Sequence, residues 1–118
     1  MRILGFSKKW AKLGHKEFST FRFPRRDRDW EIGEQVQIVI KPRHKDRQIL
    51  GIAEIINKEL RSPDAEFPRR DYLTISDEEA RIDGFEDYED MWHWILSTYG
   101  AGDRLMSEPM NKLTLKWL

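Results

Sequence analysis

Two β-branched segments separated by a short basic turn constrain the fold of this chain more than any other feature. Residues 35–41 (QVQIVIK) and 49–56 (ILGIAEII) both have the composition of strands. Only residues 42–48 separate them, so we expect an antiparallel hairpin. A single hairpin could not bury five Trp, six Phe and three Tyr, so further strands must join it.

Four shorter segments supply those strands. They lie at residues 3–6, 18–23, 72–75 and 113–118. Helices are expected after Ser7, after Ser76 in a Ser-x-x-Glu capping box, and over residues 86–98, where apolar residues recur at helical spacing. The pattern predicts an α+β domain with about five or six mostly antiparallel strands and two or three helices. A closed or nearly closed small β-barrel would leave few exposed strand edges.

Length and composition exclude several classes of protein. A chain of 118 residues is expected to form a single domain over residues 1–118. It has no cysteine, which excludes disulfides, thiolate metal sites and a cysteine nucleophile. The apolar runs are far shorter than the roughly 20 residues that span a bilayer, and the N-terminus lacks the apolar stretch of a signal peptide. We therefore expect a cytoplasmic protein without membrane association.

The formal net charge of zero hides a strong asymmetry along the chain. Residues 1–61 contain 15 Lys/Arg and 8 Asp/Glu, a balance of +7, whereas residues 62–118 contain 6 and 13, a balance of −7. Such asymmetry favours a polyanionic partner or an acidic interaction face. The alternative is that an acidic helix packs near a basic sheet and that the charges are solvated.

The basic residues cluster around one aromatic strand. With period 2, Phe21 and Phe23 share the expected core face, so Thr20 and Arg22 point together into solvent or a cleft. The cluster comprises Lys16, Thr20, Arg22, Arg25, Arg26 and Arg28, interleaved with Phe21, Phe23 and Trp30. Arginine binds phosphate in a bidentate manner and aromatic faces stack on bases, which suits a nucleic-acid groove. Solvated pairs with neighbouring carboxylates are the alternative.

Other polar groups give weaker signals. The basic turn at residues 41–47 is expected to be a hairpin tip, which either is only solvated or holds a phosphate backbone. Acidic residues at 77–90 complement helix N-termini, and no metal site or cofactor is predicted from them. Trp92 and Trp94 lie about 200° apart around a helix, so one should lie near the surface, where it could contact a protein partner.

Four segments in this order resemble the ASCH domains, a branch of the PUA-like superfamily built on a small β-barrel. They are GHKEFSTFR at residues 14–22, EIGEQV at 31–36, LGIAEI at 50–55 and DGF at 83–85. The match spans nearly the whole chain. The resemblance implies that RNA or a modified nucleoside or nucleotide is held in a cleft against the barrel.

One ASCH branch hydrolyses acylated cytidine and others resemble ribonucleases. By position, that resemblance implies Thr20 as a nucleophile activated by Lys16 and assisted by Asp83, with Arg22 binding ligand. In the amidohydrolase branch the Lys lies three residues before the Thr, whereas Lys16 lies four before Thr20, so either Ser19 replaces the Thr or a bulge absorbs one residue.

Asp83 is also one methylene shorter than the family's Glu, which affects the geometry that hydrolysis requires. We therefore expect binding through Thr20, Arg22, Arg25 and Arg26, with Trp30 as a stacking surface. A nucleoside amidohydrolase or ribonuclease acting in the same cleft, and a protein-interaction module, remain the alternatives.

Overall fold

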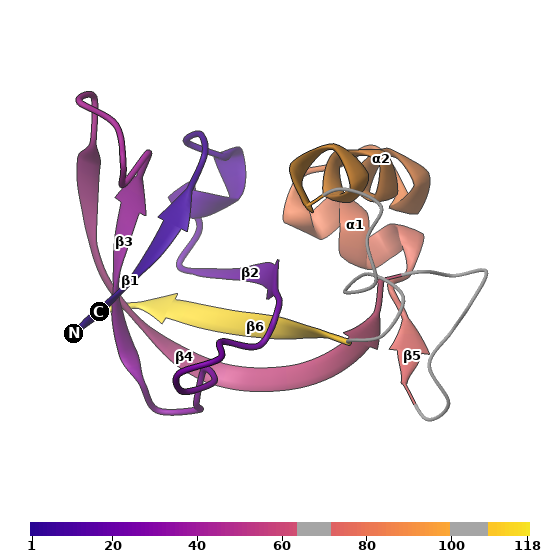
Figure 1. The fold of residues 1–118 in the computed structure, drawn as a ribbon, viewed down its shortest axis with the longest axis horizontal. Coiled ribbons are helices and arrows are strands. Elements are labelled where there is room, and N and C mark those ends of the chain that lie inside the picture. Colours follow the sequence, from indigo (N-terminus) through magenta and orange to yellow (C-terminus); the bar gives the residue numbers. More distant parts are fainter. Residues whose placement is uncertain (64–71, 100–108) are drawn as a thin grey trace.

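The fold is a six-stranded, mostly antiparallel sheet accompanied by two α-helices and one 3-10 turn (Figure 1). A computed structural model describes residues 1–63, 72–99 and 109–118. The strands are β1 (Arg2–Phe6), β2 (Glu17–Arg22), β3 (Gln35–Ile40), β4 (Gln48–Ser62), β5 (Leu73–Thr74) and β6 (Met110–Trp117). The helical elements are η1 (Ala11–Gly14), α1 (Asp77–Asp83) and α2 (Tyr88–Tyr99).

The sheet has the strand order β1-β3-β4-β6-β2, and β5 pairs with the far end of β4. The predicted hairpin is confirmed, because β3 and β4 pair antiparallel on either side of the basic turn. β1 pairs parallel with β3, and β2 pairs antiparallel with β6. β1 and β2 are therefore the two ends of an open path. No pairing between the described strands closes the sheet, so the structure does not show the expected closed or nearly closed barrel.

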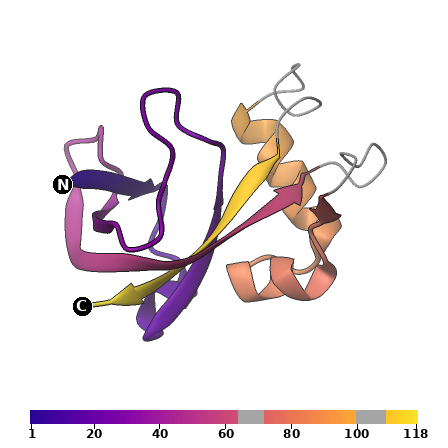
Figure 2. The same cartoon turned by 90° about the horizontal axis from the view of Figure 1, so that it is seen from below.

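β4 is much longer than the apolar run that predicts it. It pairs with β6 from Ala53 opposite Trp117 to Arg61 opposite Met110. A bulge at Ile56 shifts the register of this pairing, and a bulge bends a strand and increases its twist. The curved strand carries the sheet from the β3 side toward the helices, as Figures 1 and 2 show.

The two faces of the sheet bury different apolar clusters. One cluster includes Leu4, Phe18, Ile38, Ile55 and Leu113 and lies on the inner side of the curved sheet. The other packs the ends of β2 and β6 against the helices and includes Phe21, Phe23, Met91, Ile95 and Met110. Phe21 and Phe23 are each 6% exposed, which confirms them as core residues.

Local signals explain both α-helices. The Ser76 hydroxyl accepts the Glu79 N–H at 3.1 Å while the Glu79 carboxylate accepts the Ser76 N–H, so the predicted capping box is present. Gly84 ends α1 in the left-handed conformation. In α2, Met91 and Ile95 belong to the second cluster.

Within the described ranges, no helix is long and apolar enough to cross a membrane.

Candidate functional site

Two adjoining cavities bring together most of the predicted site residues. A wide outer cleft of about 880 Å³ is lined by the cationic side chains of Arg22, Arg25, Arg26, Lys41 and Arg43, together with Asp27 and His44. A smaller inner pocket of about 370 Å³ lies between β2, η1 and the helices. Gly5, Phe6, Ser7, Arg22 and Tyr99 line both cavities, so these residues mark the junction.

A buried ion pair lies in the inner pocket. Lys12 comes from η1 and Asp83 from the last turn of α1, and Lys12 Nζ donates to Asp83 Oδ1 at 2.6 Å. Each side chain is only 7% exposed. Burial lowers the pKa of Lys12 and raises the pKa of Asp83, while the opposite charge of each partner counteracts the shift. The pair also ties the sheet-bound 3-10 turn to the helices.

Thr20 and Arg22, which the sequence places on one strand face, both line the inner pocket. Arg22 Nε donates to Thr20 Oγ1 at 3.1 Å, and the guanidinium lies 4.6 Å from the centre of the Phe6 ring. Burial lowers the pKa of Arg22, although Tyr99 and Asp83 oppose the shift and a guanidinium remains protonated in proteins. The Lys12 ammonium lies 5.5 Å from the same ring.

The charges of the inner pocket suit an anionic or strongly polar ligand. Its ionisable groups include the cations Lys12 and Arg22 and the carboxylate of Asp83. Ionised together, the three leave a surplus of one positive charge. Aromatic rings from Phe6, Trp10, Phe85, Trp94 and Tyr99 complete much of the lining. An apolar wall with a few convergent polar groups is typical of a small-molecule site.

Lys16, the predicted activating lysine, is placed differently. It is exposed immediately before β2 and lines neither of the two cavities. Lys12 occupies the position beside Asp83 instead. The sequence gives little to distinguish Lys12 from Lys16: Lys12 precedes Leu13 in a single turn that Gly14 ends. The contact of that turn with Asp83 of α1 shows which lysine is buried.

Arg25 and Arg26, predicted to bind ligand, are exposed and line the outer cleft. Arg25 Nε approaches Asp27 Oδ1 at 3.4 Å, with side chains 46% and 63% exposed. A pair this exposed contributes little to stability, so Arg25 can exchange Asp27 for a ligand anion at small cost. The turn between β3 and β4 adds Lys41, Arg43 and His44 to the same cleft.

Trp30 lines the outer cleft but is a core residue. It is 3% exposed, and its ring lies under the guanidinium groups of Arg2 at 4.4 Å and Arg25 at 5.5 Å. Trp30 therefore forms part of the cleft floor and offers no open face for stacking in this conformation. The sequence around Trp30 does not indicate that its ring is buried, because the burial depends on a contact from Arg2 of β1.

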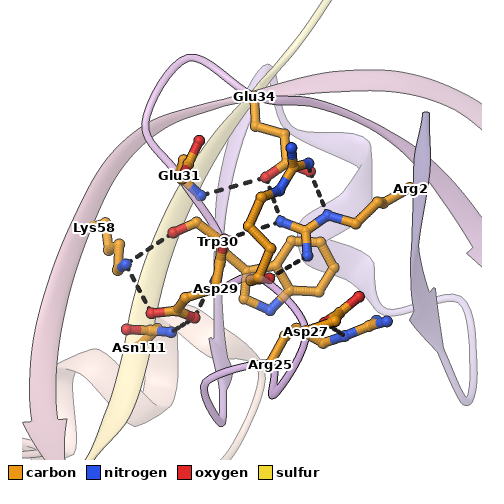
Figure 3. A network of polar contacts seen from close by, with 10 residues as sticks. Arg2, Arg25, Asp27, Asp29, Trp30, Glu31, Glu34, Lys58 and Asn111 are labelled. Atoms are coloured by element: carbon orange, nitrogen blue, oxygen red, sulfur yellow. Dashed lines mark hydrogen bonds and ion pairs between the residues drawn. The ribbon is translucent and has the colours of Figure 1, made fainter.

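A polar network fixes the loop that carries Trp30 and the exposed arginines (Figure 3). The Arg2 guanidinium donates to both Glu34 carboxylate oxygens, at 2.6 and 2.7 Å. Asp29 accepts from Lys58 of β4 and from Asn111 of β6, each at 2.8 Å. The loop is thus held against three strands, which positions the outer cleft beside the sheet.

Comparisons with protein-family models, with curated proteins and with solved structures find no match to this chain. Across the described part of the chain, no three His, Asp or Glu side chains cluster so as to hold a metal ion. The site is therefore interpreted from its own geometry and chemistry.

Proposed function

We propose that this domain binds RNA or a nucleotide, with phosphates in the outer cleft and a base or nucleoside in the inner pocket. The observation that carries the proposal is the junction of the two cavities at Arg22. A basic open cleft suits a phosphate backbone, whereas an aromatic-walled pocket with few polar groups suits one heterocycle. A ligand that spans both cavities would place its phosphates against the cations of the outer cleft and its base against the aromatic wall of the inner pocket.

The cations of the outer cleft support the polynucleotide form of this proposal. Arg25, Arg26, Lys41 and Arg43 come from two separate loops, and all four line the same cleft. Binding that neutralises phosphates releases counterions and weakens steeply with salt.

The resemblance to ASCH domains supports the same ligand class and extends the proposal to the fold. The observed sheet is strongly curved and carries Thr20 and Arg22 at its inner pocket. We propose that it is a PUA-like barrel in which pairing between β1 and β2 is missing.

The test is fluorescence anisotropy of a short labelled single-stranded RNA at low and high salt. We expect salt-sensitive binding by the wild type and about fivefold or greater weakening in Arg25→Ala and Arg26→Ala, on the scale of one charge-assisted contact. Lys116→Ala is the matched control, because it removes one exposed cation that lines neither cavity. Absence of binding at low salt would rule out the polynucleotide form.

A nucleoside amidohydrolase or ribonuclease is the second candidate, because Thr20, Lys12 and Asp83 line the same pocket. In this version Lys12 replaces Lys16 as the activating group. Turnover of acylated nucleosides should then be lost in Thr20→Val, which keeps the shape and removes the hydroxyl. Turnover that persists in this variant would exclude Thr20 as the nucleophile.

The protein-interaction module has less support. Trp94 packs against Trp10 and Phe85, with ring centres 6.2 and 5.8 Å away, and Trp92 stacks on Tyr88 at 6.5 Å. Both tryptophans are half-buried, so neither presents a fully open ring to a partner.

A further inference from the structure

Tyr99, the last residue of α2, stands where the two cavities meet. It is 44% exposed, whereas Phe6 at the same junction is 5% exposed. The other aromatic residues of the outer cleft, Phe23 and Trp30, are buried. The inner-pocket rings of Trp10, Phe85 and Trp94 are half-buried, so among the described Phe, Tyr and Trp residues that line either cavity, Tyr99 is the exposed one.

The surroundings of Tyr99 leave its ring available while holding it in place. Its described ring contact is an edge-to-face packing on Phe23, with centres 5.1 Å apart and planes at 87°. Phe23 belongs to the buried cluster between the sheet and the helices, so it is a fixed support. A ring supported in this way can accept a second aromatic group without loss of core packing.

We propose that Tyr99 stacks on an unpaired base and that the cleft therefore selects single-stranded RNA over duplex RNA. This inference rests on the proposed function and specifies its ligand. In a duplex each base is already stacked and paired, so none can lie on Tyr99 or enter the inner pocket unless it leaves the helix. The pocket volume of about 370 Å³ is at the lower end of ligand cavities, which suits a single base.

The position of Arg22 supports this arrangement. Arg22 lines both cavities beside Tyr99 and donates to Thr20, so a base on Tyr99 would have a fixed cation next to its sugar and phosphate. Stacking on Tyr99 would accept any base, because every base has a flat aromatic face. The polar groups of the inner pocket would distinguish one base from another.

The experiment compares three labelled probes at one low salt concentration: a short single-stranded RNA, an abasic strand with the same number of phosphates, and the corresponding duplex. Wild-type protein should bind the single strand roughly tenfold or more tightly than the abasic strand, as expected for one stacked base. Tyr99→Ala should lose that preference and Tyr99→Phe should keep it. Tyr72→Ala is the control, because Tyr72 is exposed and lines neither cavity.

Each result decides between the two proposals. Equal binding of the single strand and the abasic strand by the wild type would overturn base stacking and leave phosphate binding standing. A preference that survives in Tyr99→Ala, or duplex binding as tight as single-strand binding, would also overturn the inference. Failure of all three probes to bind would instead overturn the proposed RNA binding. Thermal melts show whether each variant is still folded at the assay temperature, which separates lost binding from lost folding.

Discussion

At the residue scale, the Lys12–Asp83 pair is the most consequential contact of the site. Two charges removed from water are costly to bury, and their mutual attraction repays that cost only when both are present. The pair joins residues 71 positions apart in the sequence at 2.6 Å. It therefore links the stability of the fold to the charge of the inner pocket.

Replacing one partner should destabilise the protein more than replacing both. We expect Lys12→Met to lower the free energy of unfolding by about 3–5 kcal/mol, because it leaves the Asp83 carboxylate buried without its cation. The double variant Lys12→Met/Asp83→Leu should recover most of that loss. Urea denaturation measures both, with exposed Lys116→Met as a control expected within about 0.5 kcal/mol of wild type. A single variant as stable as the double would contradict the coupling.

The Arg2–Glu34 pair predicts a pH dependence with a defined sign. Hydrogen bonds from Arg2 hold the pKa of Glu34 below its ordinary value of 4.5. Because the folded-state pKa is depressed, the stabilisation is complete above pH 4.5 and is lost as the pH falls through the lowered pKa.

Wild type should therefore exceed Glu34→Gln in unfolding free energy by about 1.5–3 kcal/mol at neutral pH, as for hydrogen bonds to charged groups. The difference should shrink on acidification, which urea melts at several pH values would measure. Glu31→Gln changes an exposed carboxylate of the same loop and serves as the matched control. A difference that grows toward low pH would show that the sign is wrong.

At the element scale, Gly84 determines how α1 meets the 3-10 turn. It has φ +113°, and a Cβ built there would lie 2.9 Å from Cε3 of Trp10. Asp83 and Phe85 on either side both line the inner pocket. The close approach of Trp10 to a glycine thus positions both the ion pair and the aromatic wall.

Gly84→Ala should lower the unfolding free energy by about 1–3 kcal/mol, because the substitution is strained in the left-handed conformation and collides with Trp10. Gly14→Ala is the matched control, since no atom lies within 4 Å of its Cβ position. We expect Gly14→Ala to be neutral or stabilising by up to about 1 kcal/mol. Thermal or chemical denaturation compares the two, and equal effects would contradict the role assigned to Gly84.

The elements that sequence patterns predicted well are those with local causes. The β3–β4 hairpin, the capping box of α1 and the apolar face of α2 each depend on residues a few positions apart. The extension of β4 to Ser62 was not predicted, because it depends on pairing with β6. Strands formed by a partner rather than by their own composition lack a local signal.

At the scale of the whole molecule, the asymmetric charge predicts a particular salt response. The cations that line the outer cleft all belong to the basic first half of the chain. If these cations bind phosphates, the salt dependence of binding should depend on which cations line the cleft and not on the net charge of the whole protein.

The double variant Lys41→Ala/Arg43→Ala should lower the slope of log affinity against log salt by about 1.4, since each phosphate contact on a single strand contributes about 0.7. Lys9→Ala/Lys116→Ala removes the same charge from exposed positions that line neither cavity. Its slope should match the wild type. Equal slopes in both double variants, measured by anisotropy, would show that the β3–β4 turn does not contact the nucleic acid.

The sequence by itself determined the α+β class, the hairpin, the helix cap and the strand face shared by Thr20 and Arg22. These follow from periodicity and capping, which act over one or two turns or a few strand residues. Only the tertiary structure decided that Lys12 rather than Lys16 meets Asp83, that Trp30 is buried under Arg2, that Tyr99 stands at the junction, and that β1 and β2 end the sheet without pairing among the described strands. Each of these depends on segments distant in sequence, whose approach is set by strand pairing and core packing.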